Sequence, residues 1–308
     1  MKNEWRTLAT RSVLSLEVKI AVMFIPRRIL EEKLLRLLAE DVGQGDVTSD
    51  AIVSSDCTAE AEVIVKANGT VAGVEEAAVL AEVLGLEVEV QVDDGAEVEK
   101  GQVIMTLSGD AATILTVERT LLNLLSRMSG IATATRNLTE KILKAKLNTR
   151  VAATRKSAPG LLHFDKKAVV LGGGDAHRLH LDDMILIKDN HIVLAGSLEN
   201  ALKLAKKNAS FSKKIEVEAT NAADALKAAE LGADIVMLDN FSVAQIKEAV
   251  SLLKKGGFSG KVLLEASGGI SSENLLEYAA SGVDLVSLGE LTHSVKALDI
   301  SLEILKAA

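Results

Sequence analysis

Cationic side chains gather in residues 154–191, although the chain as a whole is acidic. This stretch places five of them beside short apolar runs: Arg155, Lys156, His177, Arg178 and Lys188. The complete chain of 308 residues has a formal net charge of −8. Guanidinium and ammonium groups bind carboxylate and phosphate oxygens strongly. We therefore expect a site for a small ligand that carries several negative charges.

The acidic balance excludes some partners. Nucleic acid and anionic membranes need a broad basic surface, which a chain of this charge does not supply. We therefore expect neither as a partner. The single cysteine, Cys57, excludes an internal disulfide and a cysteine-built metal site, and it suits a reducing cytoplasm.

The elements that must position the cations follow a repeated pattern after Asn148, in which short apolar runs alternate with amphipathic helical segments. The expected strands are Arg150–Ala153, Met184–Ile187, Ile215–Val217, Ile235–Leu238, Val262–Leu264 and Leu285–Leu288. Repeated strand–helix units predict a β/α barrel, complete or incomplete. A doubly wound open sheet is the alternative, but it more often shows a G-x-G-x-x-G turn after its first strand. The sequence has no such turn there.

In a β/α barrel the active site lies at the C-terminal ends of the strands. Charged residues or glycines follow every expected strand, among them Arg155, Lys156, Lys188, Glu218, Asp239, Ser267, Gly268, Gly269 and Gly289. Two carboxylates that face several cations suit an anionic ligand with hydroxyl groups, bridged by Mg²⁺. The glycine-rich ends would offer backbone N–H groups to a phosphate.

Residues 26–129 have a different pattern. An amphipathic helix is expected from Pro26 to Leu38, and a Gly- and Asp-rich loop over Glu40–Asp50. The later expected elements are strands at 59–67, 86–92 and 102–107, a helix at 74–84 and a long helix from Val117 that ends at Ser129–Gly130. Period-2 alternation in the strands predicts a sheet with one wet face. We therefore expect a small α+β open-sandwich domain.

The first 25 residues are treated as an N-terminal extension of unknown role. Their apolar stretch is too short to span a bilayer. They also lack the continuous apolar region and small-residue cleavage site of a secretory signal.

Several ordered segments resemble the quinolinate phosphoribosyltransferase family, also called nicotinate-nucleotide pyrophosphorylase (carboxylating). The likeness runs from about Ile25 to the C-terminus and is carried by EDVGQGDVTSD, ERTLLNLLSRMSGIAT, TRKSAPG, GGGDAHR, LIKDNH, EVEAT, MLDN, LEASGGI and GVDLVSLGELTHSVKALDISL. The resemblance implies an N-terminal α+β domain over residues 26–129. It also implies an incomplete barrel of about six to seven strands over 130–293, and a C-terminal helix over 294–308 that returns to the first domain.

The resemblance also implies a reaction. Quinolinate and 5-phosphoribosyl 1-pyrophosphate (PRPP), with Mg²⁺ and no organic cofactor, would give nicotinate mononucleotide, pyrophosphate and CO₂ in de novo NAD synthesis. The implied quinolinate-binding residues are Arg119, Arg155, His177, Arg178 and Lys188. The implied PRPP-binding residues are Lys156, Glu218, Asp239, Ser267, Gly268, Gly269, Gly289 and His293. Lys156, Lys188, Glu218 and Asp239 would be catalytic, and Glu218 and Asp239 would also hold Mg²⁺.

Arg119 lies outside the barrel, where it could form part of a solvated helix face. The matching arginine of the family reaches into the neighbouring subunit's site, so the resemblance implies a homodimer or a higher oligomer built of dimers.

The chain departs from the family at several positions, among them Ser157 in place of a usual Thr, Ala176 in place of a common Asn, and three nearby positions on the next expected helix. Leu162 stands in place of a usual Arg, Asp165 in place of Glu, and Lys167 in place of Tyr. These departures keep open a related pyrophosphorylase-like paralogue, of the kind found with molybdenum transport genes, that acts on another acceptor. From the residues alone, two further alternatives are a barrel aldolase with Lys188 as Schiff-base nucleophile and a non-catalytic anion-binding protein.

Overall fold

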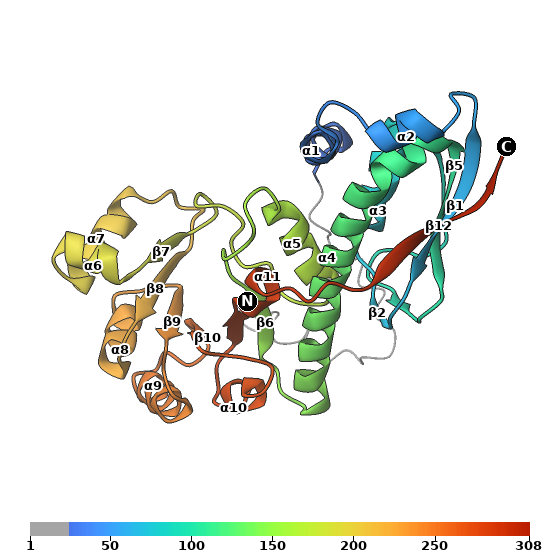
Figure 1. The fold of residues 1–308 in the computed structure, drawn as a ribbon. Coiled ribbons are helices and arrows are strands. Elements are labelled where there is room, and N and C mark those ends of the chain that lie inside the picture. Colours follow the sequence, from blue (N-terminus) through green and yellow to red (C-terminus); the bar gives the residue numbers. More distant parts are fainter. Residues whose placement is uncertain (1–24) are drawn as a thin grey trace.

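A computed structural model describes residues 25–308 (Figure 1), so the predictions made for residues 1–24 lie outside the described part. The described residues form a four-stranded antiparallel sheet, a six-stranded parallel sheet and a small two-stranded sheet. A long helix, α4 (Ala111–Lys144), runs between the two larger sheets (Figure 1). Among these residues, no helix has both the length and the apolar character needed to cross a bilayer.

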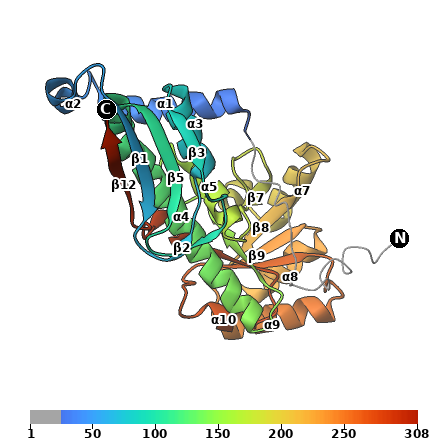
Figure 2. The same ribbon diagram turned by 90° about the vertical axis from the view of Figure 1, so that its right-hand side faces the viewer.

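The N-terminal part is an open sandwich. Its elements before α4 are α1 (Arg27–Val42), α2 (Val47–Ile52), β1 (Thr58–Val65), β2 (Gly69–Thr70), α3 (Val74–Val83), β3 (Glu87–Val90), β4 (Glu97–Val98) and β5 (Val103–Asp110). The larger sheet has the order β12-β1-β5-β3, where β12 is Ile300–Ala307. Side chains of β1 alternate between buried and less buried positions, as the period-2 pattern predicts. Helices α3 and α4 pack on one face of this sheet (Figure 2).

The expected loop over Glu40–Asp50 contains helical structure instead. Helix α1 continues to Val42, and α2 begins at Val47. The Asp46 carboxylate accepts hydrogen bonds from the backbone N–H groups of Thr48 and Ser49, both at 3.1 Å. An aspartate that caps two orphan N–H groups starts a helix as readily as it marks a turn, so this part of the prediction is wrong.

Helix α4 does not end at Ser129–Gly130, as the sequence suggested, but continues through 34 residues. Gly130 is required for a different reason, which is the space left for the C-terminal segment. A Cβ atom at Gly130 would lie 2.3 Å from the carbonyl oxygen of Lys296, because the C-terminal segment crosses the helix there. The Leu298 N–H donates to the Ser126 carbonyl at 2.9 Å beside this crossing. Gly130 therefore permits a close approach of two backbones and does not stop the helix.

The C-terminal segment returns to the N-terminal sheet, but it does so as a strand. Residues 300–307 form β12, which pairs antiparallel with β1, with Val65 opposite Ile300 and Val63 opposite Leu302. The helix predicted over 294–308 is therefore wrong for this stretch. Its apolar residues alternate with polar ones at the start of the segment, and β1 offers an otherwise open edge.

The six parallel strands form an incomplete barrel. They are β6 (Arg150–Ala153), β7 (Ile185–Ile187), β8 (Ile215–Ala219), β9 (Ile235–Asp239), β10 (Leu263–Ser267) and β11 (Leu285–Leu288). Their order is β6-β11-β10-β9-β8-β7, which leaves β6 and β7 as the two edges. The helices between and after them are α5 (Leu162–Leu171), α6 (Asp189–Ala195), α7 (Leu198–Asn208), α8 (Ala222–Glu230), α9 (Val243–Lys255), α10 (Leu275–Ala279) and α11 (Glu290–His293). The strands lie where the apolar runs predicted them, within a few residues.

A buried ion cluster joins the two parts of the chain. The Lys167 side chain on α5 is 2% exposed and contacts the Glu76 carboxylate on α3 at 2.8 Å. Asp94 lies 3.6 Å from the same ammonium, which also binds Glu75. Burial raises the pKa of Glu76, while Lys167 opposes that rise. Lys167 is therefore the buried counter-ion of Glu76.

We predict that Lys167→Met lowers the free energy of unfolding by about 3–5 kcal/mol, because it leaves a buried carboxylate without its counter-ion. Urea unfolding followed by circular dichroism measures this loss. The double variant Lys167→Met/Glu76→Leu removes both charges and should recover much of the stability. A single variant as stable as the unmodified protein would contradict the assignment.

Candidate active site

A cavity of about 460 Å³ opens at the carboxyl ends of the barrel strands. Among the residues that line it are eight that the sequence predicted: Arg155, Lys156, His177, Arg178, Lys188, Glu218, Asp239 and Ser267. They come from five of the six strands or from the segments that follow them. The barrel thus assembles cations and carboxylates that are far apart in the sequence.

Lys188 and Glu218 form an ion pair in this cavity, with 2.8 Å between the Lys188 Nζ and a Glu218 carboxylate oxygen. The Lys188 side chain is 45% exposed and that of Glu218 only 12%. The Lys188 N–H also donates to the His191 Nδ1 at 2.9 Å, at the start of α6. His191 therefore fixes the loop that presents Lys188, and the ammonium remains accessible to a ligand.

Arg155 and Arg178 both face the cavity and place like charges near each other. Burial is the main cause that lowers the pKa of Arg178, and Arg155 lowers it further. A site in which one guanidinium destabilises the charge of another has a strong electrostatic preference for an anion.

His177 is held by its neighbours through both ring nitrogens. Its Nδ1 accepts the Arg178 N–H at 2.7 Å, and its Nε2 lies 3.1 Å from a Glu265 carboxylate oxygen. Burial lowers the pKa of His177, but the neighbouring Glu216 and Glu265 carboxylates outweigh it and raise the pKa. Because Nδ1 accepts the Arg178 N–H, the ring hydrogen that faces these carboxylates is on Nε2. Direct contact of this ring with a ligand carboxylate, which the resemblance implies, stays a prediction.

Glu216 and Glu265 are missing from the sequence-based site. Glu216 lies inside β8, and Glu265 lies in the middle of β10, whereas the expected strand Val262–Leu264 ended before it. They are 0% and 1% exposed. An acidic residue in the middle of an apolar, two-sided buried strand is the signal that could have identified them.

Lys166 is a third residue that the sequence reasoning missed. Its side chain is buried and donates to the carbonyl of Ala176, in the segment that carries His177 and Arg178. Burial lowers the pKa of Lys166 to about 8. Its place in a helix gave no sign that it supports the segment that carries His177 and Arg178.

Gly268 and Gly269 follow β10 and Gly289 follows β11, but these glycines and His293 are not among the residues that line the cavity. Gly268 and Gly269 have positive φ angles of 90° and 63°. A Cβ atom at Gly268 would lie 2.3 Å from the Asn240 side chain, so glycine is required there. At Gly289 a Cβ atom would lie 3.2 Å from Lys156 and 2.9 Å from His293. Gly289, His293 and Lys156 therefore lie beside one another, whereas Gly268 lies against Asn240.

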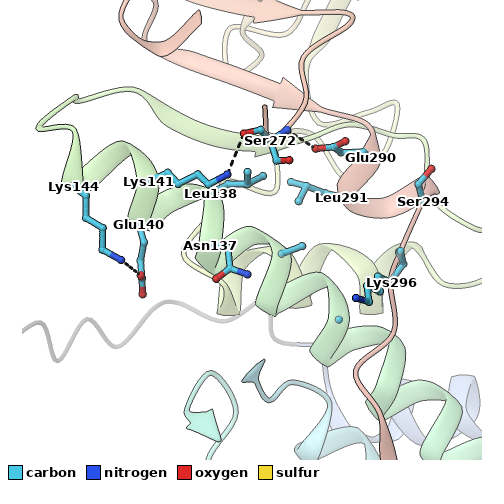
Figure 3. Close-up of a pocket in the computed structure, with 13 residues that line it drawn as sticks. Asn137, Leu138, Glu140, Lys141, Lys144, Ser272, Glu290, Leu291, Ser294 and Lys296 are labelled. Atoms are coloured by element: carbon cyan, nitrogen blue, oxygen red, sulfur yellow. Dashed lines mark hydrogen bonds and ion pairs between the residues drawn. The ribbon is translucent and has the colours of Figure 1, made fainter. Parts of the chain in front are cut away.

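A separate cavity of about 570 Å³ lies behind these loops, between α4 and the segment that follows β11 (Figure 3). None of the predicted site residues lines it. Its polar contacts brace the loops: the Ser272 N–H donates to Glu290 at 3.1 Å, and the Lys141 ammonium donates to the Ser272 carbonyl at 3.1 Å (Figure 3). Glu290 thereby ties the loop after β10 to the loop after β11.

The Asp165 carboxylate has an arginine partner despite Leu162. Arg127 on α4 binds both of its oxygens, at 2.7 and 2.8 Å, and also donates to the Thr292 carbonyl at 2.9 Å. Asp165 is 0% exposed. The fork of Arg127 joins α4, α5 and the segment beside Gly289, so the departures at residues 162 and 165 affect packing around the site.

Arg119 is not brought to the cavity within one chain. It lies on α4, its side chain is 61% exposed, and its guanidinium is 3.3 Å from the neighbouring Glu118 carboxylate. A role in the site would therefore require a second chain.

Comparison with known proteins agrees with this geometry. The chain matches the quinolinate phosphoribosyl transferase N-terminal domain over residues 46–129 and the C-terminal domain over residues 131–303. It is 47% identical over 262 residues to a probable nicotinate-nucleotide pyrophosphorylase [carboxylating] of Archaeoglobus fulgidus, covering 85% of this chain and 99% of that one. It is 44% identical over 268 residues to its counterpart in Methanothermobacter thermautotrophicus, covering 87% and 96%.

Among solved structures, the nicotinate-nucleotide pyrophosphorylase from Francisella tularensis is similar with a TM-score of 0.84 and 37% identity. The likeness covers 92% of this chain and 98% of that one. The fold class and the family predicted from the sequence are both confirmed. The chain belongs to the quinolinate phosphoribosyltransferase family.

Proposed function

We propose that this chain transfers the phosphoribosyl group of PRPP to quinolinate and releases pyrophosphate, CO₂ and nicotinate mononucleotide. The enzyme class follows from the family, whose curated members are carboxylating nicotinate-nucleotide pyrophosphorylases. The observation that carries the proposal is the convergence of Arg155, Arg178 and Lys188 with Glu218 and Asp239 in one cavity.

Quinolinate is a dianion with two adjacent carboxylates, so it needs more than one cationic contact. Arg155 and Arg178 supply planar guanidinium groups, which match carboxylate geometry. Lys188 supplies the third positive charge, and a substrate carboxylate replaces Glu218 as its ion-pair partner. The repulsion between the two arginines is relieved when the dianion binds.

PRPP binds on the glycine-rich side of the cavity. Ser267 and the backbone of Gly268 and Gly269 receive the 5-phosphate, together with Gly289 and His293. Backbone N–H groups in turns with positive φ form concave sites for anions. Lys156, whose side chain passes over Gly289, contacts the phosphates that leave as pyrophosphate.

Glu218 and Asp239 carry the chemistry at the ribose. Both end parallel strands and face the cavity, where their charges stabilise the oxocarbenium-like state at the anomeric carbon. The same oxygens fit Mg²⁺, which prefers one or two carboxylates and the phosphates of its substrate. When bound, the ion would supply neutralisation of the pyrophosphate charge. The Glu218 carboxylate is paired with Lys188, and the Asp239 carboxylate accepts from the Asn240 side chain. Each carboxylate could exchange this side-chain partner for the metal ion.

Decarboxylation follows the transfer. The ring nitrogen becomes a cationic pyridinium once it is bonded to ribose, and it then accepts the electrons that CO₂ leaves behind. The protein's part is to hold the ring in place and exclude water. No organic cofactor is required for this step.

Arg119 completes the site from a second chain in this proposal, which makes the protein a homodimer or an assembly of dimers. Its exposed guanidinium is available for that contact. The single cysteine suits action in the cytoplasm.

The geometry argues against the aldolase alternative. A Schiff-base lysine needs an uncharged amine, usually in an apolar pocket or beside another cation. Lys188 instead forms a 2.8 Å ion pair with the Glu218 carboxylate in a cavity lined by charged side chains.

The acceptor is the first quantity to measure. With PRPP and Mg²⁺ present, we expect equal amounts of pyrophosphate and CO₂ from quinolinate and at most a trace of pyrophosphate from nicotinate, which lacks the second carboxylate. Comparable turnover of the two acceptors would overturn the substrate assignment, and binding without pyrophosphate release would favour a non-catalytic role.

A shared site predicts complementation. Arg119→Ala and Lys188→Ala should each reduce quinolinate turnover by more than about tenfold, since each removes a charge-assisted contact worth about 1.5–3 kcal/mol. Mixed dimers of the two variants contain one site with neither change and should regain up to about a quarter of the normal activity. Activity that stays at the level of the single variants after subunit exchange would argue against a site built from two chains.

Asp239→Asn tests the metal assignment. The amide keeps the shape of the side chain but removes the charge that favours Mg²⁺. We expect the Mg²⁺ concentration for half-maximal rate to rise by about tenfold or more, while the dissociation constant of quinolinate, measured by calorimetry, changes little. An equal loss in both quantities would contradict the division of roles.

A further inference from the structure

The strongest unexplained feature is a group of buried charges inside the barrel. Glu216 on β8 and Glu265 on β10 both face the His177 ring, with carboxylate oxygens 3.5 and 3.1 Å from its Nε2. Among the described residues, both Glu216 oxygens and one Glu265 oxygen are buried without a hydrogen-bond partner. Buried carboxylates are costly unless they interact with something specific, so their presence requires an explanation.

A metal ion does not explain this cluster. The three side chains lie close enough together to hold one. However, His177 Nδ1 accepts the Arg178 N–H at 2.7 Å, so the ring hydrogen is on Nε2. A nitrogen that carries hydrogen has no lone pair for a metal. Nε2 instead donates to Glu265, and that hydrogen bond fixes the orientation of the ring.

The ring in turn holds a strained segment. His177 has a positive φ of 53°, which is uncommon for a residue with a side chain. Its N–H donates to the Asp175 carboxylate at 2.8 Å, and Lys166 binds the carbonyl of Ala176. A further contact of this segment is the one from the Arg178 N–H to the ring. The backbone position of Arg178 therefore depends on where the ring lies, and the ring depends on Glu265.

We propose that Glu265 is a positioning residue that acts through His177 to hold Arg178 at the quinolinate end of the cavity, with Glu216 as a second carboxylate under the same ring. The inference rests on the proposed function, in which Arg178 binds a quinolinate carboxylate. It predicts that Glu265 affects quinolinate binding much more than PRPP binding.

The test is a double-mutant cycle between Glu265 and His177. Glu265→Ala should raise KM for quinolinate by about tenfold and leave KM for PRPP within about twofold. Glu265→Gln should restore most of the affinity, because its amide oxygen can still accept from Nε2. In a His177→Asn background, Glu265→Ala should have almost no further effect, because the ring through which it acts is gone. Additive effects, or equal increases in both KM values, would overturn the proposal.

Nitrogen-15 NMR of the unliganded protein supplies a second readout that does not depend on activity. The Nε2 signal of His177, assigned by its loss in His177→Asn, should be that of a protonated nitrogen in the unmodified protein and in Glu265→Gln. An unprotonated Nε2 in the unmodified protein would refute the hydrogen bond, even if Glu265→Ala failed to fold.

Glu76→Gln is the matched control, since Glu76 is equally buried but lies on α3 against Lys167. It should lower thermal stability and leave both KM values unchanged. A failure of the unmodified protein to use quinolinate would sink the proposed function, whereas the NMR result would still decide the role of Glu265.

Discussion

The concentration of positive charge in one cavity is the constraint on which the rest of the structure depends. Four cationic side chains, Arg155, Lys156, Arg178 and Lys188, face the same small volume. Burial, and then repulsion from Arg155, lowers the pKa of Arg178 there. Two kinds of carboxylate offset this positive charge. Glu218 pairs with Lys188 at the accessible surface of the cavity, while Glu216 and Glu265 remain buried beneath His177. In the proposed function a substrate carboxylate replaces Glu218 beside Lys188, whereas Glu216 and Glu265 stay in place and orient the His177 ring.

The same site depends on helix α4, which holds the two parts of the chain together. Arg127 on this helix binds Asp165 and the Thr292 carbonyl, so one guanidinium fixes both α5 and the segment beside Gly289. Lys141, further along the helix, supports the loop after β10 through Ser272. Gly130 allows the C-terminal segment to cross and complete the first sheet as β12. A small displacement of α4 would therefore move the loops expected to bind phosphate.

The sequence was informative where local pattern decides structure. The barrel strands are short apolar runs followed by charged residues, so both their positions and most of the cavity residues could be predicted. It failed where contacts between distant segments decide. Gly130 suggested the end of a helix, but the reason for glycine is the backbone of Lys296. Residues 300–307 suit a helix or a strand, and the open edge of β1 selects the strand. The expected strand Val262–Leu264 ended before Glu265, whereas β10 continues to Ser267 and places Glu265 inside the barrel.

The structure shows what the unusual residues at positions 162, 165 and 167 contact, and these contacts help to decide which acceptor the site would bind. Asp165 receives its arginine from α4, and Lys167 provides the counter-ion of Glu76, so each unusual residue is satisfied by a partner outside the cavity. Leu162 begins α5 and does not line the cavity. A paralogue with a different acceptor should differ where the acceptor binds, yet Arg155, Arg178 and Lys188 all face the cavity. The departures therefore alter how α5 is anchored, and they give no reason to replace the dicarboxylate.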